Sequence, residues 1–353
     1  TLSGILRPMF GLIGLLLVGY PAALSGTVAA DAGIEYDSNP ARVPSDGSLG
    51  VDPQGAPLFR GLVAGTLSYA GPKQRLRLSA TATGKAFFTP EAQSQNVLVA
   101  QLGYEHGAKL NRTLVVATVD YYDAFQASAP TYLERDFRSL SGGGRFHAVK
   151  PLEHGHRIDG GLQLTGLLFD YKPDPLQSFA GPSLLAKLGG RIHAGDPELG
   201  HDFDLNLQGR SDLRFYGPVR RDVFLAVSTS IQWQGPLLIQ LGYTAQLNFS
   251  SSELESYQRH LPMLKVAFHL PGELFVTVKG QLNLQKAAPG LTFPIQSIDE
   301  DNRSVALFDV ERPLPKGFAL SARYTGYFSL PSDGTSPYQR HTGLLNVSYR
   351  FAQ

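Results

Sequence analysis

The clearest pattern along this chain is a strict alternation of apolar and polar residues, seen best between Leu199 and Tyr216. Successive side chains of a β-strand point to opposite faces of the sheet, so this alternation predicts a strand with one apolar and one polar face. One face must meet apolar material, and the other must meet water or polar groups. The apolar positions are Phe203, Leu205, Leu207, Leu213 and Phe215, and the polar ones are Asp202, Asp204, Asn206, Gln208, Arg210, Asp212 and Arg214.

The same pattern recurs through the chain and predicts about sixteen strands, with an error of about two either way. Most would be about 10 to 15 residues long, which exceeds the usual length of strands in soluble proteins. The expected strands lie at about 27–36, 58–69, 75–86, 96–107, 113–125, 137–149, 156–170, 178–194, 200–216, 221–234, 237–250, 257–270, 274–286, 303–312, 318–328 and 340–351.

The connections between these strands alternate in length, which predicts an up-and-down antiparallel arrangement. Short turns rich in Pro and Gly follow one strand, and mostly longer polar loops follow the next. In barrels of the bacterial outer membrane the short turns face the periplasm, so we expect both termini there as well. The short turns are 70–73, 151–155, 234–236, 271–273 and 313–317, and the longer loops are 37–56, 126–136, 250–255, 286–302 and 330–339.

A soluble sandwich or propeller would also show alternation, so further evidence is needed to decide whether the apolar face meets lipid or a second sheet. The polar face carries many charges, which a filled soluble core would not tolerate without extensive pairing. Outward aromatic residues also gather at strand ends, as in the two aromatic girdles of a membrane barrel. They include Tyr69, Tyr104, Phe146, Trp233, Phe268, Phe318, Tyr349 and Phe351 near short turns, and Phe59, Phe169, Phe215 and Phe249 near longer loops.

These features favour a single transmembrane antiparallel β-barrel, closed because lipid cannot satisfy an open sheet edge. A barrel of about sixteen strands encloses an aqueous channel, whereas smaller barrels fill with side chains. The slight basic excess on its inner face suggests a mild anion preference; the alternative is that the charges pair and select nothing. The predicted channel-lining residues include Arg60, Arg75, Arg77, Lys85, Arg145, Arg157, Lys187, Arg191, Asp202, Asp204, Arg210, Asp212, Arg214, Lys265 and Lys279.

Residues 1–30 predict a secretory signal peptide that is cleaved near Ala30. Arg7 precedes an apolar run from Met9 to Tyr20 that is too short to span a bilayer, and small residues follow it. A retained apolar helix is the alternative. The expected organisation is this leader followed by one barrel over residues 31–353, with no plug and no separate periplasmic domain.

Composition removes several other function classes. The 353 residues include no Cys, which rules out disulfides, thiolate metal sites and thiol nucleophiles. The 31 basic and 30 acidic residues nearly balance, so we expect no binding to nucleic acid.

Three clusters could carry chemistry, and each has a simpler interpretation. His154 and His156 are too few for a structural zinc site and belong in a solvated turn. The run 299–302 could bind Ca²⁺ but lacks the spacing of a dedicated loop. Within 201–204 the imidazole and the two carboxylates lie on opposite faces. We therefore expect no enzymatic activity, metal or cofactor.

The whole pattern resembles the β-barrels of the Gram-negative outer membrane. Gly33–Pro40 is similar to the first strand and loop of several such barrels, including ones linked to export of surface polymers or lipoproteins. Leu345–Phe351 resembles the terminal assembly signal, with Tyr349 and Phe351 as its aromatic residues, although Ala352 and Gln353 follow it. The resemblance implies an outer-membrane location, contact with lipid and lipopolysaccharide, and recognition by the barrel-assembly machinery.

The favoured function is a channel for passive diffusion of small hydrophilic solutes. The alternative is the barrel component of an envelope export or assembly complex that works with separate periplasmic proteins. General porins narrow their channel with a long third loop and form trimers, but loop 126–136 is short here. A homo-oligomer is therefore possible without being indicated by any residue of this chain.

Overall fold

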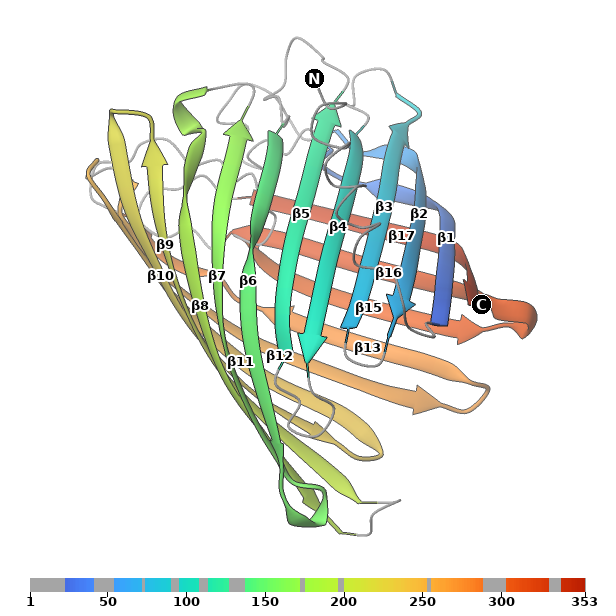
Figure 1. The fold of residues 1–353 in the computed structure, drawn as a ribbon. Coiled ribbons are helices and arrows are strands. Elements are labelled where there is room, and N and C mark those ends of the chain that lie inside the picture. The colour runs from blue at the N-terminus through green and yellow to red at the C-terminus, as the bar shows by residue number, and fades with distance from the viewer. Residues whose placement is uncertain are drawn as a thin grey trace.

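The computed structural model describes residues 23–40, 54–71, 74–89, 95–107, 114–126, 137–171, 175–195, 200–252, 255–287, 303–329 and 338–352. These residues form one antiparallel sheet of 17 strands (Figure 1). The strands are β1 Ala23–Asp37, β2 Ala56–Ala70, β3 Gln74–Phe87, β4 Gln95–Gly107, β5 Leu114–Gln126, β6 Phe137–Pro151, β7 Arg157–Tyr171, β8 Phe179–Ala194, β9 His201–Tyr216, β10 Arg220–Gln234, β11 Leu237–Ser250, β12 Tyr257–Leu270, β13 Leu274–Gln281, β14 Leu284–Ala287, β15 Ser304–Pro313, β16 Phe318–Ser329 and β17 Tyr338–Ala352.

The sheet closes on itself. Each strand pairs with the next in sequence, except that β14 pairs with β12 and β13 pairs with β15. The last strand, β17, pairs with β1 from Thr27 opposite Ala352 to Asp37 opposite Thr342. Since β13 and β14 lie one after the other along β12, the strands fill sixteen positions around the ring. The predicted fold class, a single antiparallel up-and-down barrel, is confirmed. No helix among the described residues is long and apolar enough to cross a bilayer.

The predicted strand 274–286 is interrupted in the structure between β13 and β14. The break lies opposite Pro262 of β12, whose carbonyl accepts a hydrogen bond from the Leu282 amide at 3.0 Å. Proline has no N–H, so Pro262 cannot return the second bond of this pair. The register is the same on both sides of the break, because Met263 still pairs with Gln281 and His260 with Leu284.

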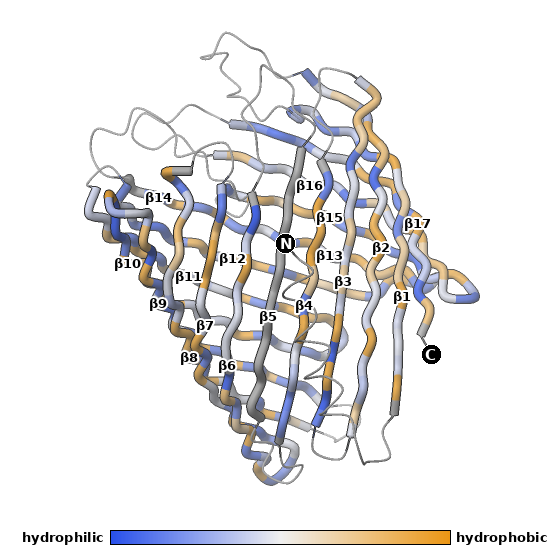
Figure 2. The backbone as a smooth tube through the Cα atoms, turned by 45° about the horizontal axis from the view of Figure 1, so that its top comes forward, coloured by the Kyte–Doolittle hydropathy of each residue, from blue (hydrophilic) through white to orange (hydrophobic). Residues whose placement is uncertain are grey.

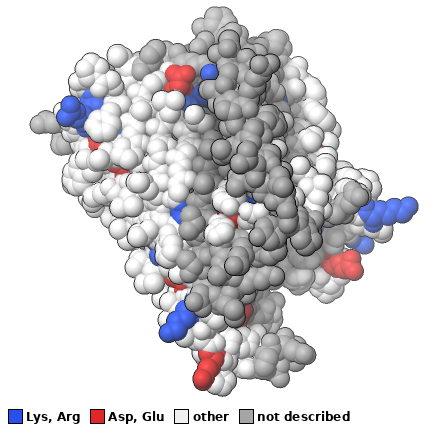
Figure 3. Space-filling view, viewed as in Figure 1, with Lys and Arg blue, Asp and Glu red and all other residues white. Residues whose placement is uncertain are grey.

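Apolar side chains cover the outside of the barrel. Leu164 of β7 is 62% exposed and Leu345 of β17 is 66% exposed, and similar residues recur at every second position of most strands. Figure 2 shows the resulting exchange of apolar and polar residues along the strands, and Figure 3 shows few charged side chains across the visible wall. A monomeric protein in water rarely exposes so large an apolar surface, whereas lipid satisfies it. The barrel therefore spans a membrane.

Two of the short turns share one sequence pattern and one conformation. Pro151–Gly155 and Pro313–Gly317 each contain a 3₁₀ turn, closed by a hydrogen bond from the Leu152 amide to His156 and from the Leu314 amide to Phe318. The last two residues of each turn have positive φ, with 80° at Gly155 and 82° at Gly317. Glycine adopts this conformation without strain, which explains its place at the end of both turns.

The first strand begins earlier than the sequence predicts. Ala23–Ala30 belongs to β1 and pairs with β2, starting at Ala23 opposite Ala70. Cleavage near Ala30 would remove this half of the strand. Residues 1–22, which contain most of the predicted leader, lie outside the described part of the chain, so the leader and the domain boundary remain predictions.

Candidate functional site

The candidate site is the inner face of the barrel. On β9 the exposed apolar residues Phe203, Leu205 and Leu207 have odd numbers, so the even-numbered residues face inward. Every other predicted lining residue likewise lies on the parity opposite the exposed apolar side chains of its strand. That these residues line a conducting path stays a prediction.

One ion-pair cluster joins β8 and β9 near the short turns. The Arg191 guanidinium donates two hydrogen bonds to Asp204, at 2.7 and 2.8 Å, and lies 3.2 Å from Asp202. His193 Nδ1 lies 2.8 Å from the other oxygen of Asp202. Two parallel bonds to one carboxylate fix the guanidinium plane, so Arg191 is a rigid part of this wall.

A second cluster lies on β9 near the longer loops. The Asp212 carboxylate is fully buried and accepts hydrogen bonds from Arg210 at 2.8 Å, Arg214 at 3.0 Å and Ser183 at 2.6 Å. The Arg214 guanidinium also lies 4.5 Å from the ring centroid of Phe224 on β10. Both predicted lining arginines are thus neutralised in part by one buried acid.

The closure of the barrel carries a buried ion pair that joins residues far apart in sequence. Asp37 of β1 is 0% exposed and Arg340 of β17 is 3% exposed, and the guanidinium donates to both carboxylate oxygens. The Asn39 amide N–H donates to Asp37 at 3.0 Å, and its side chain donates to the Gln339 carbonyl at 3.2 Å.

Two further acids on the inner face, Glu35 and Asp222, accept hydrogen bonds from cationic or amide side chains. Glu35 accepts from Lys85 at 2.9 Å and Arg60 at 3.4 Å, which uses two of the predicted lining cations. Asp222 of β10 accepts from Arg220 and from Asn248 of β11. The contacts of Glu35 join β1 to β2 and β3, and the Asn248 amide joins β11 to β10, at the end of the barrel that carries the longer loops.

Arg75 and Arg157 pair with Glu105 and Asp159, at 3.8 and 3.6 Å, whereas five other predicted lining cations have no such partner. These five cations make no ion pair with any described residue, and among the described inward acids the same holds for Asp31 and Glu311. The unpaired cations are Arg77, Arg145, Lys187, Lys265 and Lys279.

Two of these lysines are direct neighbours across a strand pair. Lys265 of β12 stands opposite Lys279 of β13 in the register. Like charges directly opposite each other destabilise a sheet, so this lysine pair lowers the stability of the sheet at this position. The nearest acid along β15 is Asp309, which is already bound to Arg323 at 2.8 Å.

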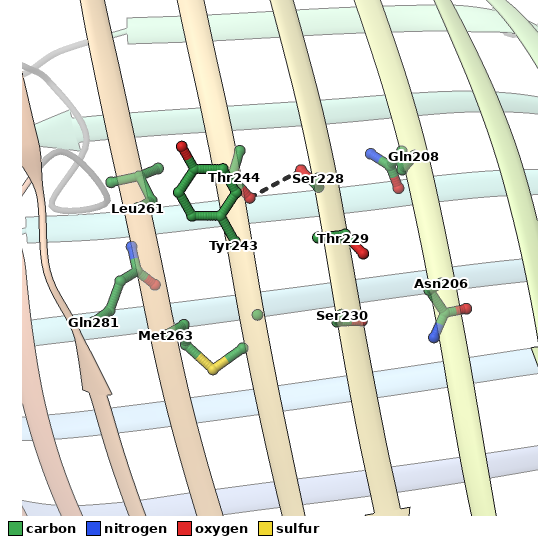
Figure 4. Close-up of a pocket in the computed structure, with 11 residues that line it drawn as sticks. Asn206, Gln208, Ser228, Thr229, Ser230, Tyr243, Thr244, Leu261, Met263 and Gln281 are labelled. Atoms are coloured by element: carbon green, nitrogen blue, oxygen red, sulfur yellow. Dashed lines mark hydrogen bonds between the residues drawn. The ribbon is translucent and has the colours of Figure 1, made fainter.

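A shallow cavity of about 200 Å³ lies beside the lysine pair, on the wall formed by β9 to β13 (Figure 4). Its lining contains no charged side chain. Thr244 Oγ1 donates to Ser228 Oγ at 2.9 Å, as the dashed line in Figure 4 marks. The amide and hydroxyl groups on its inward side belong to Asn206, Gln208, Ser228, Ser230, Thr244 and Gln281.

Sequence reasoning selected charged residues and so missed this uncharged wall. It also missed the buried pair of Asp37 with Arg340, because the two residues meet only when the last strand closes on the first. Alternation does place Asp37 and Glu35 opposite Ile34 and Tyr36, so the inward direction of both acids could have been deduced.

All but one of the predicted aromatic girdle residues lie on the outward parity of their strands. Six of them are well exposed, between 43% and 55%, namely Phe59, Phe146, Phe215, Phe249, Phe318 and Phe351. Tyr69, Tyr104, Trp233, Phe268 and Tyr349 are partly exposed. A girdle role for this set, and an assembly-signal role for Tyr349 and Phe351, stay predictions.

One aromatic assignment was wrong. Phe169 lies on the inward parity of β7, since the exposed residues of that strand are Leu162, Leu164 and Leu168. Its ring stacks on Phe179 of β8 with centroids 5.2 Å apart. The error arose at the end of the strand, where Leu167, Leu168 and Phe169 are consecutive apolar residues and alternation no longer distinguishes the two faces.

The structure describes two of the three clusters that could carry chemistry, namely those at 154–156 and 201–204. The rings of His154 and His156 lie 6.4 Å apart, and His156 Nδ1 accepts a hydrogen bond from the His193 amide at 3.0 Å. The His201 ring lies 5.6 Å from Trp233 on the outward side, away from Asp202 and Asp204. Residues 299–302 are outside the described ranges.

No protein-family model and no curated protein sequence matches this chain. Among solved structures, Acinetobacter baumannii OccAB3 is similar over 93% of this chain and 99% of its own, with 10% identity and a TM-score of 0.50. Salmonella typhi OmpF, in complex with daunomycin, is 10% identical over 94% of this chain and 98% of its own, with a TM-score of 0.49. At these identities the likeness concerns the fold.

The fold and its apolar outer surface define the chain as a porin-like β-barrel of the Gram-negative outer membrane. The predicted class and the outer-membrane location are confirmed.

Proposed function

We propose that this protein is a channel for passive diffusion of small hydrophilic solutes. The observation that carries the proposal is the polar and charged inner face of a closed ring of sixteen strand positions. Barrels of this strand number leave an aqueous passage, because side chains of opposite walls do not meet across the interior. We further propose that the short turns and both termini face the periplasm, by the usual arrangement of such barrels.

The proposed channel has a mild preference for anions. Its support is the set of inner cations without a described acidic partner, which outnumbers the unpaired acids. Fixed positive charge on a pore wall raises the local concentration of anions and favours their passage. Solute transport, and not catalysis, is the activity that we assign, since His201 and its neighbouring acids lie on opposite faces of the wall.

The test is electrical recording from the purified barrel in a planar bilayer that separates two concentrations of potassium chloride. We expect steady open conductance and a reversal potential of the sign that chloride permeation produces. The potential should move toward zero at high ionic strength, because salt screens the wall charges. A silent barrel would overturn the channel proposal, and a potential of the opposite sign would overturn the anion preference.

The export alternative draws on the resemblance at Gly33–Pro40. In the structure Asp37 and Asn39 bond to Arg340 and to the Gln339 carbonyl, respectively. These contacts give the segment a role in barrel closure, which accounts for its residues without an export partner. Diffusion is therefore the function that the structure supports better.

A further inference from the structure

The wall around the cavity is unusual for this barrel because it is polar without being charged. Along all of β11, and on β10 from Ala226 to Gln234, no inward residue is ionisable. The neighbouring inner positions of β9 are Asn206 and Gln208, with charged clusters above and below them. Hydroxyl and amide groups are thus concentrated in one zone, at mid-height of the barrel.

Several of these groups are available to a ligand. The side chains of Asn206, Gln208, Ser230 and Gln281 have no hydrogen-bond partner among the described residues. Figure 4 shows the two β9 amides on one side of the cavity and Gln281 on the other, with the hydroxyl residues between them. An amide offers donors and acceptors together, which suits the hydroxyl groups of a polyol.

Positive charge borders this uncharged zone directly. Lys265 and Lys279 each lie two residues from a lining residue, Met263 and Gln281 respectively, on the same face. Two residues of a strand span about 6.6 Å, which is within the length of a six-carbon chain. The opposed lysines remain unfavourable until an anion lies between them, so the pair is suited to one carboxylate.

From this juxtaposition we propose that the cavity and the lysine pair form one binding site for polyhydroxy acids. The carboxylate binds between Lys265 and Lys279, and the hydroxyl groups bind the amides and hydroxyls of the cavity. The proposal rests on the proposed channel function and names the class of solute that the channel selects. An open wall of this kind retains a solute briefly and then releases it, as conduction requires.

The experiment compares three solutes as blockers of single-channel current in potassium chloride. Potassium gluconate carries both features, glucose carries the hydroxyls alone, and potassium acetate carries the carboxylate alone. We expect half-block by gluconate at a concentration at least about tenfold below either comparison solute, which corresponds to about 1.4 kcal/mol. Equal potency of gluconate and acetate, or of gluconate and glucose, would overturn the site.

Two double variants separate this site from general charge effects. Lys265→Gln with Lys279→Gln should reduce gluconate potency to the level of glucose. The control, Arg77→Gln with Arg145→Gln, removes the same charge from strands β3 and β6 and should leave gluconate potency within about twofold, a difference below about 0.5 kcal/mol. Equal loss in both variants means that only net charge matters, which rejects the site.

A third variant tests the uncharged part. Gln208→Met with Gln281→Met keeps side-chain length but removes both amides, and it should weaken block by gluconate while block by acetate stays unchanged. Equilibrium dialysis of labelled gluconate against the detergent-solubilised barrel measures the same site without current. A conducting barrel without gluconate preference would overturn this inference alone, whereas a silent barrel that binds gluconate would overturn only the channel.

Discussion

Individual charges on the inner wall differ in how firmly they are held. The Asp37 and Arg340 side chains are buried and joined by more than one hydrogen bond, whereas Arg75 and Glu105 are 3.8 Å apart and more than a quarter exposed. Buried pairs cost desolvation when they form, but loss of one partner leaves an uncompensated charge. Exposed pairs lose little when broken, because water replaces the partner.

We therefore expect Arg340→Met to destabilise the barrel by about 3–5 kcal/mol, because Asp37 is left buried without its cation. Urea unfolding in lipid vesicles, followed by fluorescence of the single tryptophan, Trp233, measures this. Adding Asp37→Leu to Arg340→Met should recover most of the loss. The control is Arg75→Met, for which we expect less than about 1 kcal/mol. Similar losses in the two single variants would contradict this account.

The sequence predicted which face of the sheet each charged side chain occupies, but it did not predict which side chains form ion pairs. Alternation alone assigned Asp202, Asp204 and Arg191 to the inner face, because strand geometry fixes the face to which each side chain points. It could not show that Arg191 binds both acids or that Lys265 opposes Lys279, because these contacts depend on the register between strands. Register follows from turn conformation and packing of the whole sheet.

At the scale of elements, nearly every strand was predictable, since alternation sustained over ten or more residues rarely occurs outside a strand with two different faces. Two departures have local causes. The β13–β14 break depends on Pro262 in the neighbouring strand, so the sequence of 274–286 holds no sign of it. The early start of β1 lies among small residues, where alternation is weak and a leader was expected.

The two related turns allow a matched comparison of glycine. A Cβ at Gly317 would lie 2.5 Å from the Arg350 carbonyl oxygen, whereas one at Gly155 would meet the His193 side chain at 3.4 Å. Both positions have positive φ, so Gly155→Ala should cost on the order of 1 kcal/mol through backbone strain alone. Gly317→Ala should cost clearly more, because the backbone carbonyl cannot move aside easily. Urea midpoints of the two variants give the difference, and equal midpoints would refute the steric argument.

The whole molecule combines a lipid-facing exterior with an interior in which most of the described charges are paired. Its architecture and location could be predicted because they follow from periodicity, strand length and turn length. The solute class that we propose could not be predicted, because it depends on the position of an uncharged zone beside Lys265 and Lys279. Uncharged polar residues alternate in any strand with a wet face, so they carry no signal of their own.

Pairing within the interior also sets how the proposed channel should respond to loss of one charge. Asp204→Asn removes an acid that holds Arg191, so we expect a reversal potential shifted toward chloride selectivity. Arg191→Gln should shift the potential the opposite way by a similar amount. Measurements at low ionic strength give the largest difference, since screening is weakest there. Shifts of the same sign in both variants would show that these charges do not act on permeating ions.

The ion pair between Asp37 and Arg340 joins residues separated by 303 positions, near the two ends of the described chain. The cation of this acid comes from the last strand, so Asp37 acquires it only when β17 pairs with β1. Contacts of such long sequence separation form late and slowly. Formation of this one pair therefore marks completion: a barrel arrested before closure would leave Asp37 and Arg340 unmatched, and closure joins them.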